Sequence, residues 1–184
     1  MTDQAQPRAE ALLIGGRSGS GKSSVGWEVA AQLRTAGVGH ALIEGDVMGE
    51  IYPPPADDPD TSRITQRNLA AVWANYTDLG CHRLVYTNTA CVLASETALF
   101  TGALGDGTRL IRVLLTASDA TVRARLTGRE LGSELDQQLR RSDRMARVLD
   151  AGVPPETVRV ATDGRAVRDI AADVITAAGW KPAG

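Results

Sequence analysis

The strongest constraint in this sequence is the segment Gly16-Arg-Ser-Gly-Ser-Gly-Lys-Ser23, which matches the pattern G-x-x-x-x-G-K-[ST] at every defined position. The segment follows a short apolar run, Ala11–Ile14, and it precedes Val25, Val29 and Leu33, which recur at helical spacing. A strand, a glycine-rich loop and a helix in this order predict a phosphate-binding loop. Glycine is needed there because backbone N–H groups must approach phosphate oxygens closely, and a Cβ atom would block that approach.

The phosphate-binding loop, Gly16–Ser23, predicts a site for a nucleoside triphosphate. We expect Lys22 to reach the β- and γ-phosphates and Ser23 to place its hydroxyl on Mg²⁺. The N-terminus of the following helix adds unpaired N–H donors and a partial positive charge. The candidate nucleotide-binding residues of this segment are Gly16, Arg17, Ser18, Gly19, Ser20, Gly21, Lys22, Ser23 and Ser24.

Short β-branched runs alternate along the chain with longer stretches at helical spacing, a pattern that predicts an α/β fold with a parallel sheet. We expect one domain over residues 1–184, with a flexible N-terminus at 1–9 and a three-layer fold of the phosphate-loop NTPase type, nucleotide-kinase-like with an arginine-rich lid. The five expected strands are Ala11–Ile14, Ala41–Glu44, Arg83–Thr87, Leu110–Leu115 and Thr157–Ala161. The expected helices are roughly Gly21–Ala36, Ser62–Leu79, Thr89–Thr101, Asp119–Thr127, Ser133–Asp150 and Ala166–Ala178, with Ser118 as the N-cap of the fourth.

Composition limits the partners of the chain. A formal net charge of −2 over 184 residues does not favour a nucleic-acid partner. The longest apolar runs are too short to span a bilayer, and the polar first residues lack the apolar core of a signal peptide. Cys81 and Cys91 have no metal-ligand or disulfide spacing. We therefore expect a cytoplasmic monomer or homodimer that acts on a small molecule.

The rest of the sequence limits which class of nucleotide-using protein this chain can be. A GTPase is expected to carry an N-K-x-D-like motif, but Lys22 and Lys181 are the only lysines. A motor ATPase usually ends its third strand in acidic residues, whereas Arg83–Thr87 is followed by Asn88 and Thr89. These absences favour a small kinase.

Asp46 is the candidate catalytic carboxylate, because it follows the strand Ala41–Glu44 at the edge where parallel sheets build their sites. It is expected either to orient the acceptor hydroxyl and accept its proton or to hold Mg²⁺. The alternative is an N-cap of a short helix that begins at Val47.

An arginine-rich segment over about 123–147 is the candidate lid. Arginines in a closing lid stabilise the charge that spreads over a transferred phosphoryl group. We expect Arg125 and Arg129 to be catalytic and Arg123 to bind the nucleotide. The alternative is a solvated helix whose arginines are ion-paired with neighbouring acids.

The acceptor is expected between the loop after the second strand and the helix Ser62–Leu79. Asp46, Tyr52, Arg63 and Arg67 are the candidate substrate contacts, and the two arginines share a helix face that suits a phosphate, sulfate or carboxylate. The alternative is a solvent-facing helix. Asp163, after the fifth strand, is a candidate nucleotide contact near the adenine or a cap of the last helix.

The phosphate-binding loop, Gly45-Asp46 and the arginine-rich segment together resemble the small P-loop kinases. That group includes adenylylsulfate kinase, gluconate and shikimate kinases, chloramphenicol phosphotransferase and the tunicamycin-resistance ATP-binding proteins. By this resemblance Asp46 falls near the acceptor hydroxyl. The departure is Thr87-Asn-Thr, where nucleotide kinases often have an Asp-Gly or Asp-Arg pair. Small polar residues there are more similar to the tunicamycin-resistance group, which implies an antibiotic or other secondary metabolite among the acceptors.

Two functions remain open from the sequence. The first is an ATP- and Mg²⁺-dependent phosphotransferase that acts on a hydroxyl or phosphate of a small metabolite, nucleotide or antibiotic. The second is an ATP-binding protein that sequesters a ligand or acts as a switch without phosphoryl transfer, and the missing acid after the third strand favours it.

Overall fold

The fold is built on a five-stranded parallel sheet with the strand order β2-β3-β1-β4-β5. This computed structural model describes residues 8–128 and 133–180 of the chain. Parallel pairing runs without interruption from β2 to β5, and β1 lies in the centre between β3 and β4. The predicted α/β architecture is therefore confirmed. The strands are β1 (Glu10–Gly15), β2 (Ala41–Glu44), β3 (Arg83–Thr87), β4 (Arg109–Thr116) and β5 (Val158–Ala161).

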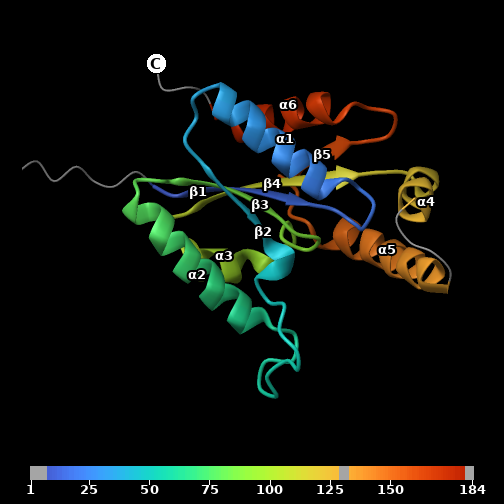
Figure 1. The fold of residues 1–184 in the computed structure, drawn as a ribbon, viewed down its shortest axis with the longest axis horizontal. Helices are drawn as coiled ribbons and strands as arrows, with labels where there is room; N and C mark the ends of the chain where they lie inside the picture. The colour runs from blue at the N-terminus through green and yellow to red at the C-terminus, as the bar shows by residue number, and fades with distance from the viewer. Residues whose placement is uncertain (1–7, 129–132, 181–184) are drawn as a thin grey trace, which may run out of the picture.

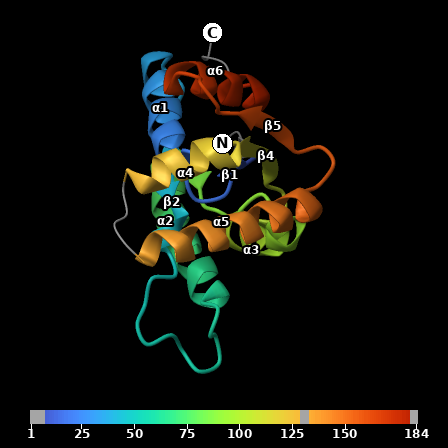
Figure 2. The same ribbon diagram turned by 90° about the vertical axis from the view of Figure 1, so that its right-hand side faces the viewer.

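Helices cover both faces of the sheet and make the three layers (Figure 1). On one face lie α1 (Lys22–Thr35) and α6 (Val167–Ala178), and on the other lie α2 (Ser62–Asp78) and α3 (Thr97–Leu104). Figure 2, which looks onto the end of the sheet where the strands finish, shows the remaining two helices in front of it. These are α4 (Asp119–Thr127) and α5 (Ser133–Gly152). No helix in the described ranges is long and apolar enough to cross a membrane.

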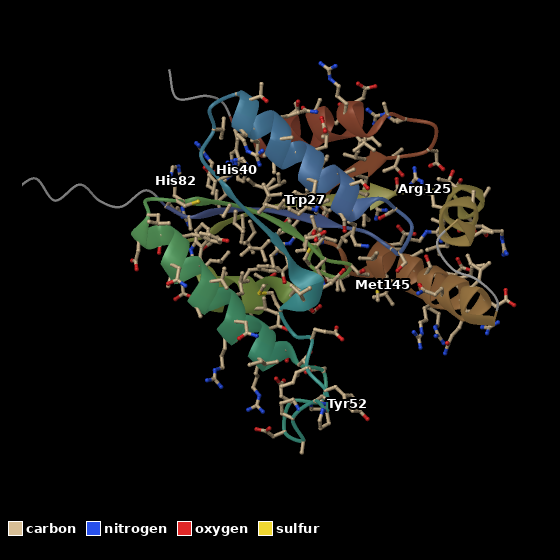
Figure 3. The ribbon with its side chains drawn as sticks, viewed as in Figure 1. Trp27, His40, Tyr52, His82, Arg125 and Met145 are labelled. Carbon is tan, nitrogen blue, oxygen red and sulfur yellow. The ribbon has the colours of Figure 1, made fainter. Side chains whose placement is uncertain are left out.

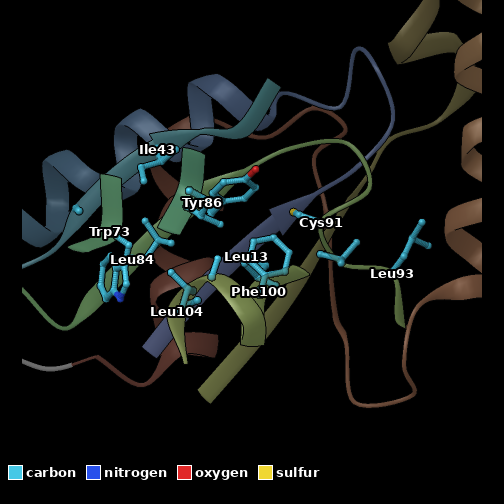
Figure 4. Packing of buried hydrophobic residues seen from close by; sticks show 14 of the residues in the cluster. Leu13, Ile43, Trp73, Leu84, Tyr86, Cys91, Leu93, Phe100 and Leu104 are labelled. Carbon is cyan, nitrogen blue, oxygen red and sulfur yellow. The ribbon is translucent and has the colours of Figure 1, made fainter. Parts of the chain in front are cut away.

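The core consists of two large apolar layers separated by the sheet, and a small third cluster of Val122, Leu126 and Leu139 lies between α4 and α5. Leu12 and Ile14 of β1 face α1 and α6, whereas Leu13 faces α2 and α3, because successive side chains of a strand point to opposite faces. In the second layer, Tyr86 of β3 meets Phe100 of α3 edge to face, with ring centroids 5.1 Å apart (Figure 4). The central strand is buried on both faces, so the loop that follows it starts from a rigid base.

The helix expected over Thr89–Thr101 is wrong in its first half. Helix α3 begins only at Thr97, after a 3₁₀ turn, η2 (Ala94–Glu96). The side chain of Asn88 accepts a hydrogen bond from the backbone N–H of Ala90 at 2.9 Å, and such local bonds compete with a helix. The other predicted elements agree with the structure to within two residues at each end, and the N-cap role of Ser118 is confirmed.

The irregular stretch before η2 supports the phosphate-binding loop. The backbone N–H of Gly16 donates to the carbonyl of Thr89 at 3.2 Å. Val92 packs closely over Gly15, because a Cβ atom on Gly15 would lie only 2.5 Å from a methyl carbon of Val92. The chain after β3 thus lies directly against the start of the phosphate-binding loop, which a regular helix from Thr89 would not allow.

Candidate active site

The phosphate-binding loop has the backbone shape that its glycines permit. Gly16, Gly19 and Gly21 have φ angles of 149°, 83° and 98°, a region that other residues adopt only with strain. A Cβ atom on Gly16 would lie 2.8 Å from the carbonyl oxygen of Leu115. The hydroxyl of Ser20 is buried and has no hydrogen-bond partner among the described residues. The loop is therefore a closely packed cradle with an unsatisfied polar group.

A cavity of about 240 Å³, here called the phosphate cavity, opens above this loop. The ammonium group of Lys22 donates to the carbonyl oxygen of Arg17 at 3.3 Å, which holds the side chain against the loop. Ser23 is exposed and lines the same cavity. The lining residues are Ser18, Gly19, Gly21, Lys22, Ser23, Ser24, Asp46, Leu126 and Gln138.

The side chain of Arg17 does not line the phosphate cavity, in contrast to the expected nucleotide contact. It is 6% exposed, and its guanidinium pairs with Asp119 at 2.6 Å and Asp143 at 3.1 Å. It also donates to the carbonyl oxygen of Ala117 at 2.9 Å. Because these partners belong to the start of α4 and to α5, the Arg17 side chain ties the phosphate-binding loop to the two helices beside it.

Asp46 lies where the sequence places it, just past the end of β2 in the 3₁₀ turn η1 (Gly45–Val47). Its carboxylate accepts a hydrogen bond from the side-chain amide of Asn88 at 2.7 Å. Gly45 is required before it, because a Cβ atom there would lie 2.2 Å from the hydroxyl of Tyr86. The carboxylate is thus held at the sheet edge from two neighbouring strands.

A second cavity, of about 540 Å³, lies on the other side of Asp46 from the phosphate cavity. We call it the acceptor cavity because it lies between the segment after β2 and the start of α2. Asp46 is the one residue of the described chain that lines both cavities. The other lining residues are Gly45, Gly49, Glu50, Asp60, Thr61, Ser62, Thr65, Tyr86, Asn88, Cys91, Glu96, Leu99 and Phe100.

The expected substrate contacts Tyr52, Arg63 and Arg67 do not line the acceptor cavity. Tyr52 is 95% exposed. It lies on the projecting loop before α2, as Figure 3 shows. The guanidinium of Arg63 is paired with Asp57 at 2.6 Å, and Arg67 is exposed on α2. Both arginines are exposed, as the solvent-facing alternative describes, and Arg63 is satisfied by a local carboxylate.

Arg125 turns its guanidinium toward the outer side of the phosphate-binding loop (Figure 3). It donates to the carbonyl oxygen of Gly19 at 3.0 Å and to both oxygens of Thr162 at 3.0 and 3.1 Å. It lines a third cavity of about 260 Å³, here called the outer cavity, and does not line the phosphate cavity. This position differs from the expected contact with the transferred phosphoryl group. Arg123 is exposed, and Arg129 lies outside the described residues.

Asp163 acts neither as a cap of α6, which begins after Ala166, nor as a wall of any of the three cavities. Its carboxylate accepts hydrogen bonds from the hydroxyl and the backbone N–H of Ser118 at 2.7 and 2.9 Å. Hydrogen bonds from Thr121 and Ser118 lower the pKa of Asp163 to about 2. Asp163 therefore fastens the N-terminus of α4.

Asn88 and Gln138 are site residues that the sequence analysis missed. Asn88 follows β3, and a polar residue at the end of a parallel strand was a usable signal. Gln138 lies on α5, far from the motif in sequence, and it reaches the phosphate cavity because Ser142 on the same helix donates to the carbonyl oxygen of Ser18 at 3.0 Å. That contact depends on helix packing and has no local pattern.

The chemistry of the phosphate cavity fits a nucleotide with its metal ion. The described residues contain no group of three or more His, Cys, Asp or Glu side chains arranged to hold a metal. Ser23 and Asp46 nevertheless line one cavity with Lys22, and Mg²⁺ in phosphate sites takes few protein ligands together with phosphate oxygens and water. The residues present therefore fit Mg²⁺ bound with a phosphate chain.

Comparison with solved structures defines the class of fold. An APS kinase from Mycobacterium tuberculosis in complex with AMPPNP and APS has 22% identity and a TM-score of 0.59, over 95% of this chain and 99% of that one. A tunicamycin resistance protein from Deinococcus radiodurans has 17% identity and a TM-score of 0.64, over 96% and 99%. A gluconokinase from Sinorhizobium meliloti has 21% identity and a TM-score of 0.59, over 95% and 93%.

The chain thus has the three-layer fold of the P-loop kinases, as the resemblance in its motifs implied. No protein-family model and no curated protein sequence matches it. At this level of identity the likeness defines the fold, and the activity has to be argued from the residues of the site.

Proposed function

We propose that this protein is an ATP- and Mg²⁺-dependent phosphotransferase that transfers the γ-phosphoryl group to a hydroxyl of a small molecule. The observation that carries the proposal is the position of Asp46, which lines both the phosphate cavity and the acceptor cavity. A carboxylate at that junction is within reach of both the end of a phosphate chain and an acceptor. The kinase names of the structural neighbours support the same class.

The nucleotide would lie across the phosphate-binding loop. Lys22 binds the β- and γ-phosphates, and backbone N–H groups of the loop donate to the other phosphate oxygens. The base occupies the outer cavity, where the planar guanidinium of Arg125 is fixed by Gly19 and Thr162 and offers a stacking surface. This placement makes Arg125 a nucleotide-binding residue rather than a transition-state arginine.

Ser23 and Asp46 are the residues that would hold Mg²⁺ together with phosphate oxygens and water. When bound, the ion neutralises charge on the phosphate chain. Arginines of the lid region 123–147 supply further positive charge to the transferred group. We propose Arg123 and Arg129 for that role, since Arg125 is committed elsewhere.

Asp46 also carries the acid–base step. Its carboxylate orients the acceptor hydroxyl, whose oxygen forms a bond to the γ-phosphorus while the bond from that phosphorus to the β-γ bridging oxygen breaks. The hydroxyl proton passes to the Asp46 carboxylate and then to water, and ADP is the leaving group. Asn88 keeps the carboxylate in place by donating to one of its oxygens at 2.7 Å.

The test follows ADP formation across a panel of hydroxylated small molecules, with mass spectrometry of the acceptor to detect the added phosphoryl group. With an accepted substrate, Asp46→Asn keeps the side-chain shape but loses the proton acceptor, so turnover should fall about 10²–10⁴-fold while ATP still binds. Lys22→Ala should remove turnover and also reduce the thermal shift caused by ATP with Mg²⁺.

Three outcomes of this experiment lead to different conclusions about Asp46 and about phosphoryl transfer. Native turnover in Asp46→Asn removes Asp46 from the catalytic residues. Partial recovery of turnover at high Mg²⁺ assigns Asp46 to the metal rather than to the proton. ATP binding without a phosphorylated product for any acceptor refutes phosphoryl transfer and supports the binding protein.

A further inference from the structure

The acceptor cavity is lined by carboxylates and by no basic side chain. Asp46, Glu50, Asp60 and Glu96 line it, and the lining set of described residues contains no lysine, arginine or histidine. The overall net charge of the chain is only −2, so this local excess does not follow from composition. The region where the acceptor binds therefore carries a concentrated negative charge.

Within the described residues Glu50, Asp60 and Glu96 form no salt bridge, and at longer range the charge of Arg63 acts on Asp60. The arginine nearest in sequence to Asp60, Arg63, is paired with Asp57 instead. Asp60 accepts a hydrogen bond from the backbone N–H of Ser62 at 3.2 Å, and Glu96 accepts one from the hydroxyl of Ser95 at 3.4 Å. Unpaired carboxylates around a cavity are available to a ligand.

The hydroxyl of a buried tyrosine in the same cavity also lacks a hydrogen-bond partner among the described residues. Tyr86 is 2% exposed, and its hydroxyl makes no hydrogen bond to any described residue. Figure 4 shows the ring beside Phe100 with the hydroxyl directed away from it. Burial, together with the charges of Cys91, Asp46 and Glu96, raises the pKa of Tyr86, so the hydroxyl stays protonated. A hydroxyl that lines a cavity without a partner gains a hydrogen bond when a polar ligand enters.

We propose that the acceptor of this enzyme is a cationic polyhydroxy compound, such as an amino sugar or an aminocyclitol. The inference rests on the proposed phosphoryl transfer, and it names the substrate class of that site. Like charge opposes entry of a phosphorylated, sulfated or carboxylated acceptor, whereas an ammonium group is attracted by Glu50, Asp60 and Glu96. Leu99 and Phe100 add an apolar wall for a ring face.

The size of the cavity agrees with this class. A volume of about 540 Å³ falls within the range of about 300–1,000 Å³ that small-molecule sites occupy. Tyr86 and Asn88 supply hydrogen-bonding groups for hydroxyls, while Asp46 receives the hydroxyl that is phosphorylated. The expected arginine recognition of an anionic acceptor is replaced by carboxylate recognition of a cationic one.

The test compares three probes that differ in charge but share one ring: glucosamine, glucose and glucuronate. Binding to the full chain is measured by calorimetry in the presence of a non-hydrolysable ATP analogue and Mg²⁺. We expect glucosamine to bind at least about tenfold more tightly than the other two, because each exposed ion pair contributes up to about fivefold. The preference should shrink as salt is added.

Carboxamide variants test which residues cause the preference for glucosamine. The double variant Glu50→Gln with Glu96→Gln keeps side-chain size, and it should reduce the preference for glucosamine to below about threefold. Asp78→Asn is the matched control, because this exposed carboxylate lies at the opposite end of α2 from the cavity. Equal affinities for the three probes, equal absence of binding, or a preference that survives the double variant would each overturn the inference.

Calorimetry and ADP formation separate the failure of the two proposals. A preference for glucosamine without ADP formation from any acceptor refutes phosphoryl transfer and supports the cationic site. ADP formation that is fastest with an anionic acceptor supports phosphoryl transfer and refutes the cationic site.

Discussion

Replacement of Arg17 by methionine tests whether this loop arginine serves structure or phosphate binding. Arg17→Met keeps a long apolar side chain but removes the guanidinium, which donates to Asp119, Asp143 and the Ala117 carbonyl oxygen. We expect a clear loss of stability and only a small loss of ATP affinity, since the side chain does not line the phosphate cavity.

The size of the loss follows from the exposure of the partners. Asp119 is 86% exposed, so its pair with Arg17 contributes at most about 1 kcal/mol. Asp143 is 49% exposed, and we assign about 1 kcal/mol to that pair and about 1 kcal/mol to the bond with the Ala117 carbonyl. The free energy of unfolding should therefore fall by about 3 kcal/mol. For a chain of this size that corresponds to a decrease in Tm of about 6–12 °C.

Differential scanning fluorimetry, with and without ATP and Mg²⁺, measures both effects. Arg34→Met is the control, because Arg34 is exposed in the last turn of α1 and should change the free energy of unfolding by less than about 0.5 kcal/mol. The reasoning is refuted if Arg17→Met melts within about 2 °C of the native protein. It is equally refuted if Arg17→Met loses as much of the ATP-induced shift as Lys22→Ala does.

Three further predictions concern single residues. Gly16→Ala should abolish ATP binding at near-native secondary structure by circular dichroism, because its methyl group would lie 2.8 Å from a backbone carbonyl oxygen. The lowered pKa of Asp163, about 2 against 3.8, means that its contribution to stability is present above about pH 4 and is lost as the pH falls toward 2. In acid titrations followed by fluorescence, Asp163→Asn should therefore remove part of the stability difference between pH 6 and pH 2, and an unchanged difference would contradict it. Burial raises the pKa of the Cys91 thiol to about 12, so iodoacetamide at pH 8 should label half-buried Cys81 well before Cys91, and peptide mass spectrometry reads the order.

The sequence predicted the parts of the site that follow from local pattern. Gly16–Ser23 and Asp46 lie at the ends of β1 and β2, and parallel strands bring such ends to one edge whatever the rest of the chain does. The N-cap role of Ser118 could also be predicted, because an N-cap depends on the residues that directly follow it. These features need no knowledge of distant contacts.

Several side chains make other contacts than the sequence suggests, because polar groups near them in space take up their donors. The guanidinium groups of Arg17 and Arg125 donate to the carbonyl oxygens of Ala117 and Thr162, which are far from them in the sequence. Arg63 was expected to face a substrate, yet the neighbouring Asp57 pairs with it. The negative charge of the acceptor cavity could not be predicted from the sequence either, because Glu50 and Glu96 come from segments more than forty positions apart.

The division of the site at Asp46 has a consequence for how this protein can change. Apart from Asp46, which lines both, the phosphate cavity takes its walls from residues 18, 19, 21–24, 126 and 138, whereas the acceptor cavity takes its walls from within residues 45–65 and 86–100. Substitutions at Glu50, Thr65 and Glu96, which line the acceptor cavity alone, therefore alter what is bound opposite the nucleotide without changing a residue of the phosphate cavity. A library that varies Glu50, Thr65 and Glu96 around a fixed phosphate-binding loop should yield proteins that differ in ligand preference but share one affinity for ATP. Because the two cavities share only Asp46, selection can change the ligand preference of the acceptor cavity by single substitutions while the phosphate cavity stays the same.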